Sequence, residues 1–213
     1  MEVYQLFKKC LTAPYKTVEE SGSYYVEKRE NALFLYFECS NGKEDWKNNF
    51  DFPIRPYRDM QDKWYCHRGF LKVWKAIEPY VAAEIMNPEI DVIVSVGYSH
   101  GGAIAQLCHE YCKFHRPDCL VEGFGFGSPR VLWGRISENV RERFKEFLII
   151  RNGRDIVTHL PPKCFGFRDV AKVVEIGNKS VYNCIEAHYP NVYEFELYTY
   201  VPFYQEVYYS SYF

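Results

Sequence analysis

Several features that would assign this 213-residue chain to a class of protein are missing from it. No apolar run reaches the roughly 18 residues that a membrane-spanning helix needs. The first residues, MEVYQLFKKCLTAPYK, also lack the apolar stretch of a secretory signal peptide. With a formal net charge of −2, the chain has no positive excess that would favour nucleic acid. These absences predict no transmembrane segment and no nucleic-acid partner. They also predict either a cytoplasmic protein or one whose signal peptide has been removed from this chain.

Internal repeats, Gly/Ser-rich linkers and Cys-x-x-Cys pairs are absent as well, so we expect a single domain over residues 1–213. The eight cysteines are interpreted mainly as reduced core residues. One group has the spacing of a helix face in its first three members and resembles a zinc ligand set: Cys108, Cys112, His115 and Cys119. Because Ile104 and Tyr111 share that face, a packed interior is the preferred interpretation, and no metal or cofactor is predicted.

Strand and helix patterns alternate along the rest of the chain. Strand-like apolar runs occupy residues 32–39, 90–96, 119–127, 146–152 and 169–178. Helical spacing occurs at 63–86, with Phe70, Trp74, Ile77 and Val81 on one face, and at 102–114 and 137–144. The polar stretch 41–57 predicts a loop or a short helix. This alternation predicts an α/β fold, a mainly parallel sheet with helices on its faces, and a site beyond the carboxyl ends of the strands.

The stretch GYSHGG, residues 97–102, follows one of these strands and opens a helical pattern. Glycine, any residue, serine, any residue, glycine in this context predicts a sharp strand-to-helix turn with Ser99 at its corner. Ser99 is therefore the expected nucleophile. The N–H of His100, at the start of the helix, is an expected donor to an oxyanion.

A serine hydroxyl needs a base, and the chain offers six histidines. His109 and His115 lie too far down the helix, and neighbouring side chains on a sharp turn diverge, which disfavours His100. His188 comes after the last sheet element and fits the order serine, acid, histidine of this architecture. Between them, Asp155 follows a strand and a glycine-containing turn, and Asp169 is its competitor.

Together these stretches resemble the class 3 lipase family, which has the alpha/beta-hydrolase fold. The resemblance spans roughly residues 32–190 and includes GYSHGG, FGFGSPRV and NGRDIVTHLPPKCFGF. The last stretch resembles the family segment that carries the catalytic aspartate, which implies Asp155 rather than Asp169. AHYPNVY resembles the segment that carries the catalytic histidine, which implies His188. CHRGFL resembles a segment ahead of a helix, which implies a structural role for His67.

The resemblance also implies an oxyanion strand and a lid. Where the family has Arg-Gly-Thr or Arg-Gly-Ser, this chain has Glu38, Cys39 and Ser40, so Ser40 is the implied second oxyanion donor. Residues 41–52 correspond to the lid. Its mixture of aromatic and charged residues predicts transient contact with a lipid–water interface.

The predicted function is a serine carboxylic ester hydrolase, a lipase or esterase acting on acylglycerols or similar apolar acyl esters, without a cofactor. The alternatives are a phospholipase A-type enzyme, a feruloyl-type esterase or an acyltransferase. A protein with the fold but without catalysis, which only binds its ligand, is a further alternative of a different class.

Overall fold

A seven-stranded sheet forms the frame of the molecule. The computed structural model describes residues 2–18, 22–39, 54–57 and 64–200. The strand order is β1-β2-β3-β6-β7-β9-β10. Their bounds are Lys16–Val18, Gly22–Arg29, Ala32–Phe37, Val92–Tyr98, Leu120–Phe126, Phe147–Asn152 and Lys172–Ile176. The pairs β1–β2 and β2–β3 are antiparallel, whereas β3–β6, β6–β7, β7–β9 and β9–β10 are parallel. The predicted mainly parallel α/β fold is confirmed.

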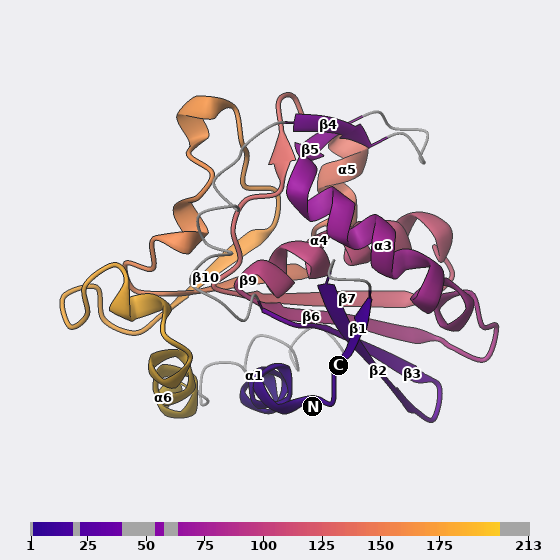
Figure 1. Ribbon diagram of the computed structural model, residues 1–213, viewed down its shortest axis with the longest axis horizontal. Helices are drawn as coiled ribbons and strands as arrows, with labels where there is room; N and C mark the ends of the chain where they lie inside the picture. The colour runs from indigo at the N-terminus through magenta and orange to yellow at the C-terminus, as the bar shows by residue number, and fades with distance from the viewer. Residues whose placement is uncertain (1, 19–21, 40–53, 58–63, 201–213) are drawn as a thin grey trace, which may run out of the picture.

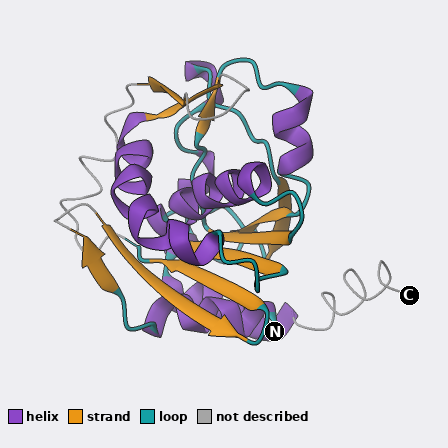
Figure 2. Cartoon of the chain, turned by 90° about the vertical axis from the view of Figure 1, so that its right-hand side faces the viewer, coloured by secondary structure: helices purple, strands orange, loops and turns teal. Residues whose placement is uncertain are grey.

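Helices cover both faces of this sheet (Figure 1). One face carries α3 (Arg68–Ile85), α4 (His100–His115) and α5 (Glu138–Arg143), and the other carries α1 (Val3–Thr12) and α6 (Pro190–Tyr200). The view in Figure 2 shows the same two layers around the twisted strands. The helical spacing predicted for residues 63–86 is confirmed from Arg68 to Ile85, because Phe70, Trp74, Ile77 and Val81 are all buried on α3. It was wrong for residues 64–67, which form a strand. Of the helices in the described ranges, none is long and apolar enough to cross a membrane.

A second, three-stranded sheet lies above α3, in the order β4-β5-β8 (Figure 1). It consists of β4 (Ile54–Tyr57), β5 (Trp64–His67) and β8 (Leu132–Trp133). The prediction of loop or helix was wrong for residues 54–57, which form a strand paired antiparallel with β5. Within the described residues β4 lies at the edge of this sheet, and edge strands are where β-sheets tolerate a proline such as Pro56.

The cysteine group on α4 packs into the core. Cys108 and Cys112 are fully buried, with their Sγ atoms 3.9 Å apart. The thiol of Cys119 donates to the carbonyl oxygen of Ile90 at 3.1 Å. In the described part of the chain, no three or more His, Cys, Asp or Glu residues are grouped so as to hold a metal ion.

Candidate active site

Ser99 stands at a tight corner between β6 and α4. Its φ of 55° and ψ of −123° lie in a region that residues other than glycine rarely adopt. The corner is this tight because α4 begins directly against the sheet. A Cβ on Gly97 would lie 2.1 Å from the carbonyl oxygen of Gly101, and a Cβ on Gly101 would lie 2.1 Å from that of Phe37. The two glycines of GYSHG are therefore required by space, and the turn lifts Ser99 to the carboxyl end of β6.

Three side chains far apart in the sequence form one hydrogen-bonded chain. Nε2 of His188 lies 2.9 Å from Oγ of Ser99, and Nδ1 of His188 lies 2.8 Å from Oδ2 of Asp155. A carboxylate accepts only, so Nδ1 carries the proton that is donated to Asp155. Nε2 is then the acceptor for the Ser99 hydroxyl. This is the geometry that allows a histidine to take a proton from a serine.

Asp155 is fully buried and receives three donors. Besides His188, the hydroxyl of Tyr193 donates to Oδ2 at 2.6 Å, and the backbone N–H of Val157 donates to Oδ1 at 2.9 Å. Burial, together with the nearby charge of Asp155, raises the pKa of Tyr193 well above its usual value. The phenol therefore stays protonated and remains a donor. Both carboxylate oxygens are thus satisfied, and the orientation of the group is fixed.

The turns that carry Asp155 and His188 are joined by a buried asparagine. Asn152 ends β9, and its side-chain amide donates to the carbonyl oxygen of Ala187 at 2.9 Å. Its backbone carbonyl accepts from the N–H of Asp155 at 2.9 Å. His188 ends a short 3-10 helix, Glu186–His188, in which Glu186 lies at the surface and Ala187 and His188 are buried. This link fixes one turn relative to the other.

Of the two predicted oxyanion donors, His100 and Ser40, only His100 lies within the described residues. His100 is the first residue of α4, and its imidazole packs edge-on against Phe70, with ring centroids 5.4 Å apart. The end of β3 lies against the same turn, as the contact between Gly101 and the carbonyl of Phe37 shows. Ser40 and the predicted lid, residues 41–52, lie outside the described residues.

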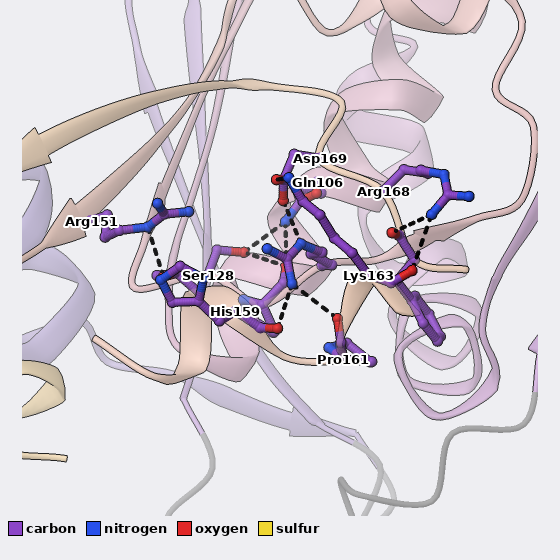
Figure 3. Close-up of polar contacts among 12 residues, drawn as sticks. Gln106, Ser128, Arg151, His159, Pro161, Lys163, Arg168 and Asp169 are labelled. Atoms are coloured by element: carbon purple, nitrogen blue, oxygen red, sulfur yellow. Dashed lines mark hydrogen bonds and ion pairs between the residues drawn. The ribbon is translucent and has the colours of Figure 1, made fainter. Parts of the chain in front are cut away.

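Asp169, the competitor for the acid, is engaged elsewhere (Figure 3). Its Oδ1 accepts from Nε of Arg130 at 2.6 Å, and its Oδ2 lies 2.6 Å from Nζ of Lys163. The buried Arg130 guanidinium also donates to the carbonyl oxygens of His159 and Pro161. Asp169 therefore fastens the loop that follows Asp155 and does not reach His188.

Replacing Asp169 with asparagine is expected to lower the free energy of unfolding at pH 7 by about 2 kcal/mol. Burial acts to raise the pKa of Asp169, but the hydrogen bonds from Lys163 and Arg130 outweigh it and lower this pKa. A lowered pKa stabilises the fold above the unfolded-state value of about 4 and loses that contribution as the pH falls through the folded-state value. Urea unfolding at pH 7 and pH 3 should show that the free-energy difference from wild type is smaller at pH 3 than at pH 7. An equal difference at both would contradict an ionic role.

His67 has a structural role, as the resemblance to the class 3 lipase family implied. Nδ1 of the buried His67 accepts from the backbone N–H groups of Gly69 and Phe70, at 3.1 and 3.3 Å. It caps the N-terminus of α3 in this way. Among the helix histidines, burial lowers the pKa of His109 to about 4, so this residue is neutral at pH 7.

Three residues around the site were not predicted: Tyr98, Gly127 and Tyr193. Tyr98 donates through its hydroxyl to the backbone carbonyl of His188. Gly127, with φ +55°, leaves the space into which Asp155 and His188 fit. Tyr98 is part of GYSHG, but this motif does not predict the direction of the Tyr98 ring. The position of Tyr193, five residues after His188, does not by itself predict that α6 turns this side chain inward to Asp155.

Comparisons with known proteins place the chain among lipases by sequence and by fold. The profile of the family described as Lipase (class 3) matches residues 34–165. The chain is 29% identical over 129 residues to the secreted mono- and diacylglycerol lipase 1 of Fusarium solani, covering 58% of this chain and 38% of that protein. It is 29% identical over 147 residues to a lipase of Rhizomucor miehei, covering 65% of this chain and 40% of that lipase. The solved structure of Rhizomucor miehei triacylglyceride lipase superposes with a TM-score of 0.66 at 21% identity, covering 79% of this chain and 66% of that one. The matches thus span less than half the length of these curated relatives.

Proposed function

Because the chain belongs to the class 3 lipase family, we propose that it is a serine carboxylic ester hydrolase acting on acylglycerols or similar esters with an apolar acyl chain. The observation that carries the proposal is the continuous hydrogen-bonded chain from Ser99 through His188 to the buried Asp155. Such a chain activates a hydroxyl that is otherwise a weak nucleophile.

In the proposed reaction, Oγ of Ser99 attacks the ester carbonyl while Nε2 of His188 takes its proton. His188 then donates this proton to the leaving alcohol, and an acyl-enzyme remains on Ser99. A water molecule, deprotonated by His188, releases the acid and restores the serine. Asp155 holds the imidazole in the required tautomer throughout and stabilises its positive charge. No step is assigned to a metal or a cofactor.

The N–H groups of His100 and Ser40 are the proposed oxyanion donors. His100 begins α4, where backbone N–H groups and the helix dipole favour a negative charge. The strand that leads toward Ser40, β3, ends against the turn that carries Ser99 and His100, which supports Ser40 as the second donor. Each donor is expected to contribute about 3 kcal/mol to the transition state.

Apolar side chains near the acid and the base support an apolar substrate. Ile156 follows Asp155, and its N–H donates to the carbonyl of Cys184, so the two turns run side by side. Ile185 and Tyr189 flank His188, with 61% and 49% of their surface exposed. Exposed apolar groups gathered beside a polar site are typical of contact with an acyl chain or a lipid surface. The predicted lid, 41–52, would extend this contact and stays a prediction.

The single-domain organisation over 1–213 is also proposed, and contacts between the two end helices support it. Lys8 on α1 forms an ion pair with Glu194 on α6 at 2.7 Å, and Tyr4 donates to the same carboxylate.

For the cellular compartment of the protein, two observations point in opposite directions. All eight thiols are free, which supports the predicted reducing, cytoplasmic location, whereas the Fusarium relative is named as secreted. Fractionation of cells that express the chain would decide between them.

A fluorophosphonate probe tests the proposed function. We expect the folded protein to be labelled once, on the peptide that contains Ser99, with Ser99→Ala and heat-unfolded protein as blanks. Nitrophenyl esters of increasing chain length, a phospholipid and a feruloyl ester would then rank the substrates. Failure of the native protein to label, or equal labelling of Ser99→Ala, would favour the non-catalytic binding protein. Preference for the phospholipid or the feruloyl ester would replace the acylglycerol assignment.

A further inference from the structure

Tyr98, the residue before the nucleophile, contacts the base in two ways. Its hydroxyl donates to the backbone carbonyl oxygen of His188. Its ring lies nearly parallel to the imidazole, with centroids 5.1 Å apart and planes 20° apart. One contact holds the main chain of His188, and the other covers a face of its side chain.

The ring of Tyr98 is itself tightly held. Only 5% of its surface is exposed, and it packs in the core layer between the sheet and α1. The rings of Phe7 and Tyr193 meet it edge-on, at 5.5 and 5.7 Å. Burial raises the pKa of Tyr98, so the hydroxyl remains protonated and keeps its role as donor. Tyr98 is thus a rigid support, whereas the chain leading to His188 runs along the surface from residue 177 to residue 186.

We propose that Tyr98 is a positioning residue for His188, so that the turn presenting Ser99 also holds the base that activates it. Tyr98 and Ser99 are consecutive residues, so the distance between Oγ of Ser99 and Nε2 of His188 is set within one rigid unit. This inference rests on the proposed function and deepens it. Both contacts of Tyr98 described above are with His188, and therefore we assign it an action through the base.

Two variants separate the two contacts. Tyr98→Phe removes the hydroxyl and keeps the ring, and we expect the rate constant of acylation to fall about tenfold. Tyr98→Leu removes the ring as well, and we expect a fall of about 100-fold, the size of effect that a misplacement near 1 Å produces. The dissociation constant of the substrate should not change in either variant, because both of the contacts that are lost are with His188.

Tyr36→Phe is the matched control. Tyr36 is fully buried on the neighbouring strand β3, in the same core layer as Tyr98. Within the described residues, its hydroxyl makes no hydrogen bond. The control therefore removes a buried tyrosine hydroxyl from the same face of the sheet without altering His188, and it should react at the wild-type rate.

Titration of active sites with a fluorophosphonate distinguishes positioning from mere folding. If Tyr98 positions the base, every site of Tyr98→Phe titrates, but the rate constant per site is low. If Tyr98 only stabilises the fold, fewer sites titrate and each reacts at the wild-type rate, which would overturn the proposal.

A second readout does not depend on hydrolysis. The proton between Nδ1 of His188 and Asp155 can be followed by NMR, and we expect its exchange with water to be about tenfold faster in Tyr98→Phe than in Tyr36→Phe. Equal exchange in both variants would overturn the positioning role. If the wild-type protein is not labelled at Ser99 but exchange still accelerates in Tyr98→Phe, the proposed function fails and the hold of Tyr98 on His188 stands.

Discussion

Asp155→Asn is expected to lower kcat/KM by about 10⁴-fold in a protein that still folds. The reason lies in the three donors around this carboxylate. An amide has only one acceptor oxygen, and the N–H of Val157 requires an acceptor at Oδ1. The amide nitrogen then takes the place of Oδ2, where it faces Nδ1 of His188 and the hydroxyl of Tyr193.

An amide nitrogen in that place donates to Nδ1 and so selects the tautomer with its proton on Nε2. Nε2 of His188 then carries a proton that points at Ser99, so it can no longer accept the proton of the Ser99 hydroxyl. The opposite orientation of the amide restores the acceptor for His188 but sets two donors, the amide and Val157 N–H, against each other. Either arrangement weakens the hydrogen bonding around a fully buried group, so the loss of activity comes with some loss of stability.

Asp169→Asn is the matched control for this experiment. It makes the same chemical change in the same loop region, on a carboxylate bound by Arg130 and Lys163. We expect Asp169→Asn to keep near wild-type kcat/KM while losing stability at neutral pH. Hydrolysis of a short nitrophenyl ester, with urea unfolding of each variant, makes the comparison. Similar losses of activity in both variants would argue against Asp155 as the acid of the triad.

Gly127→Ala is expected to lower kcat by about 100-fold. The added Cβ would lie 2.9 Å from Oδ2 of Asp155 and 2.9 Å from Cε1 of His188, closer than real Cβ contacts allow. Both groups must shift, and their shift separates His188 from Ser99. The φ of +55° adds a backbone cost of about 1 kcal/mol.

Gly134→Ala separates these two effects. Gly134 also has a positive φ, +82°, but a Cβ there would meet no atom within 4 Å. It should therefore share the backbone cost, seen as a lower melting temperature, and retain its activity. Thermal unfolding with kcat measured well below each midpoint tests this. Full activity in Gly127→Ala would show that the acid and the base are not confined by this contact.

Elements with their own periodic signal were predictable from the sequence. The apolar run of β6 and the four-residue stripe of α3 each point to one structure without reference to the rest of the chain. α1 was not predicted, because only Leu6, Phe7 and Cys10 are buried among its ten residues and lysines interrupt the pattern. β2 was missed for a related reason, since its second half is charged and only partly buried.

For the site, chain order and one motif were sufficient to propose Ser99 and His188, but not to choose between two aspartates. The resemblance to the class 3 lipase family selected Asp155. In the structure, Asp169 is instead paired with Arg130. The supporting tyrosines were beyond prediction for a physical reason. Tyr98 meets His188 across 90 positions and Tyr193 meets Asp155 across 38, and only the packed fold determines such meetings.

The pairing of α1 with α6 has a consequence for synthesis on the ribosome. The ring of Phe7 packs against that of Tyr193, which is synthesised 186 residues later (193 − 7). The layer beneath the sheet therefore cannot close before α6 has been synthesised, and until then its apolar side chains are exposed to other proteins. Since Tyr193 also holds Asp155, the nascent chain should gain a working acid and base only after α6 has left the exit tunnel. Closure by α6 would keep a chain that has not yet reached this helix inactive toward the lipids around it.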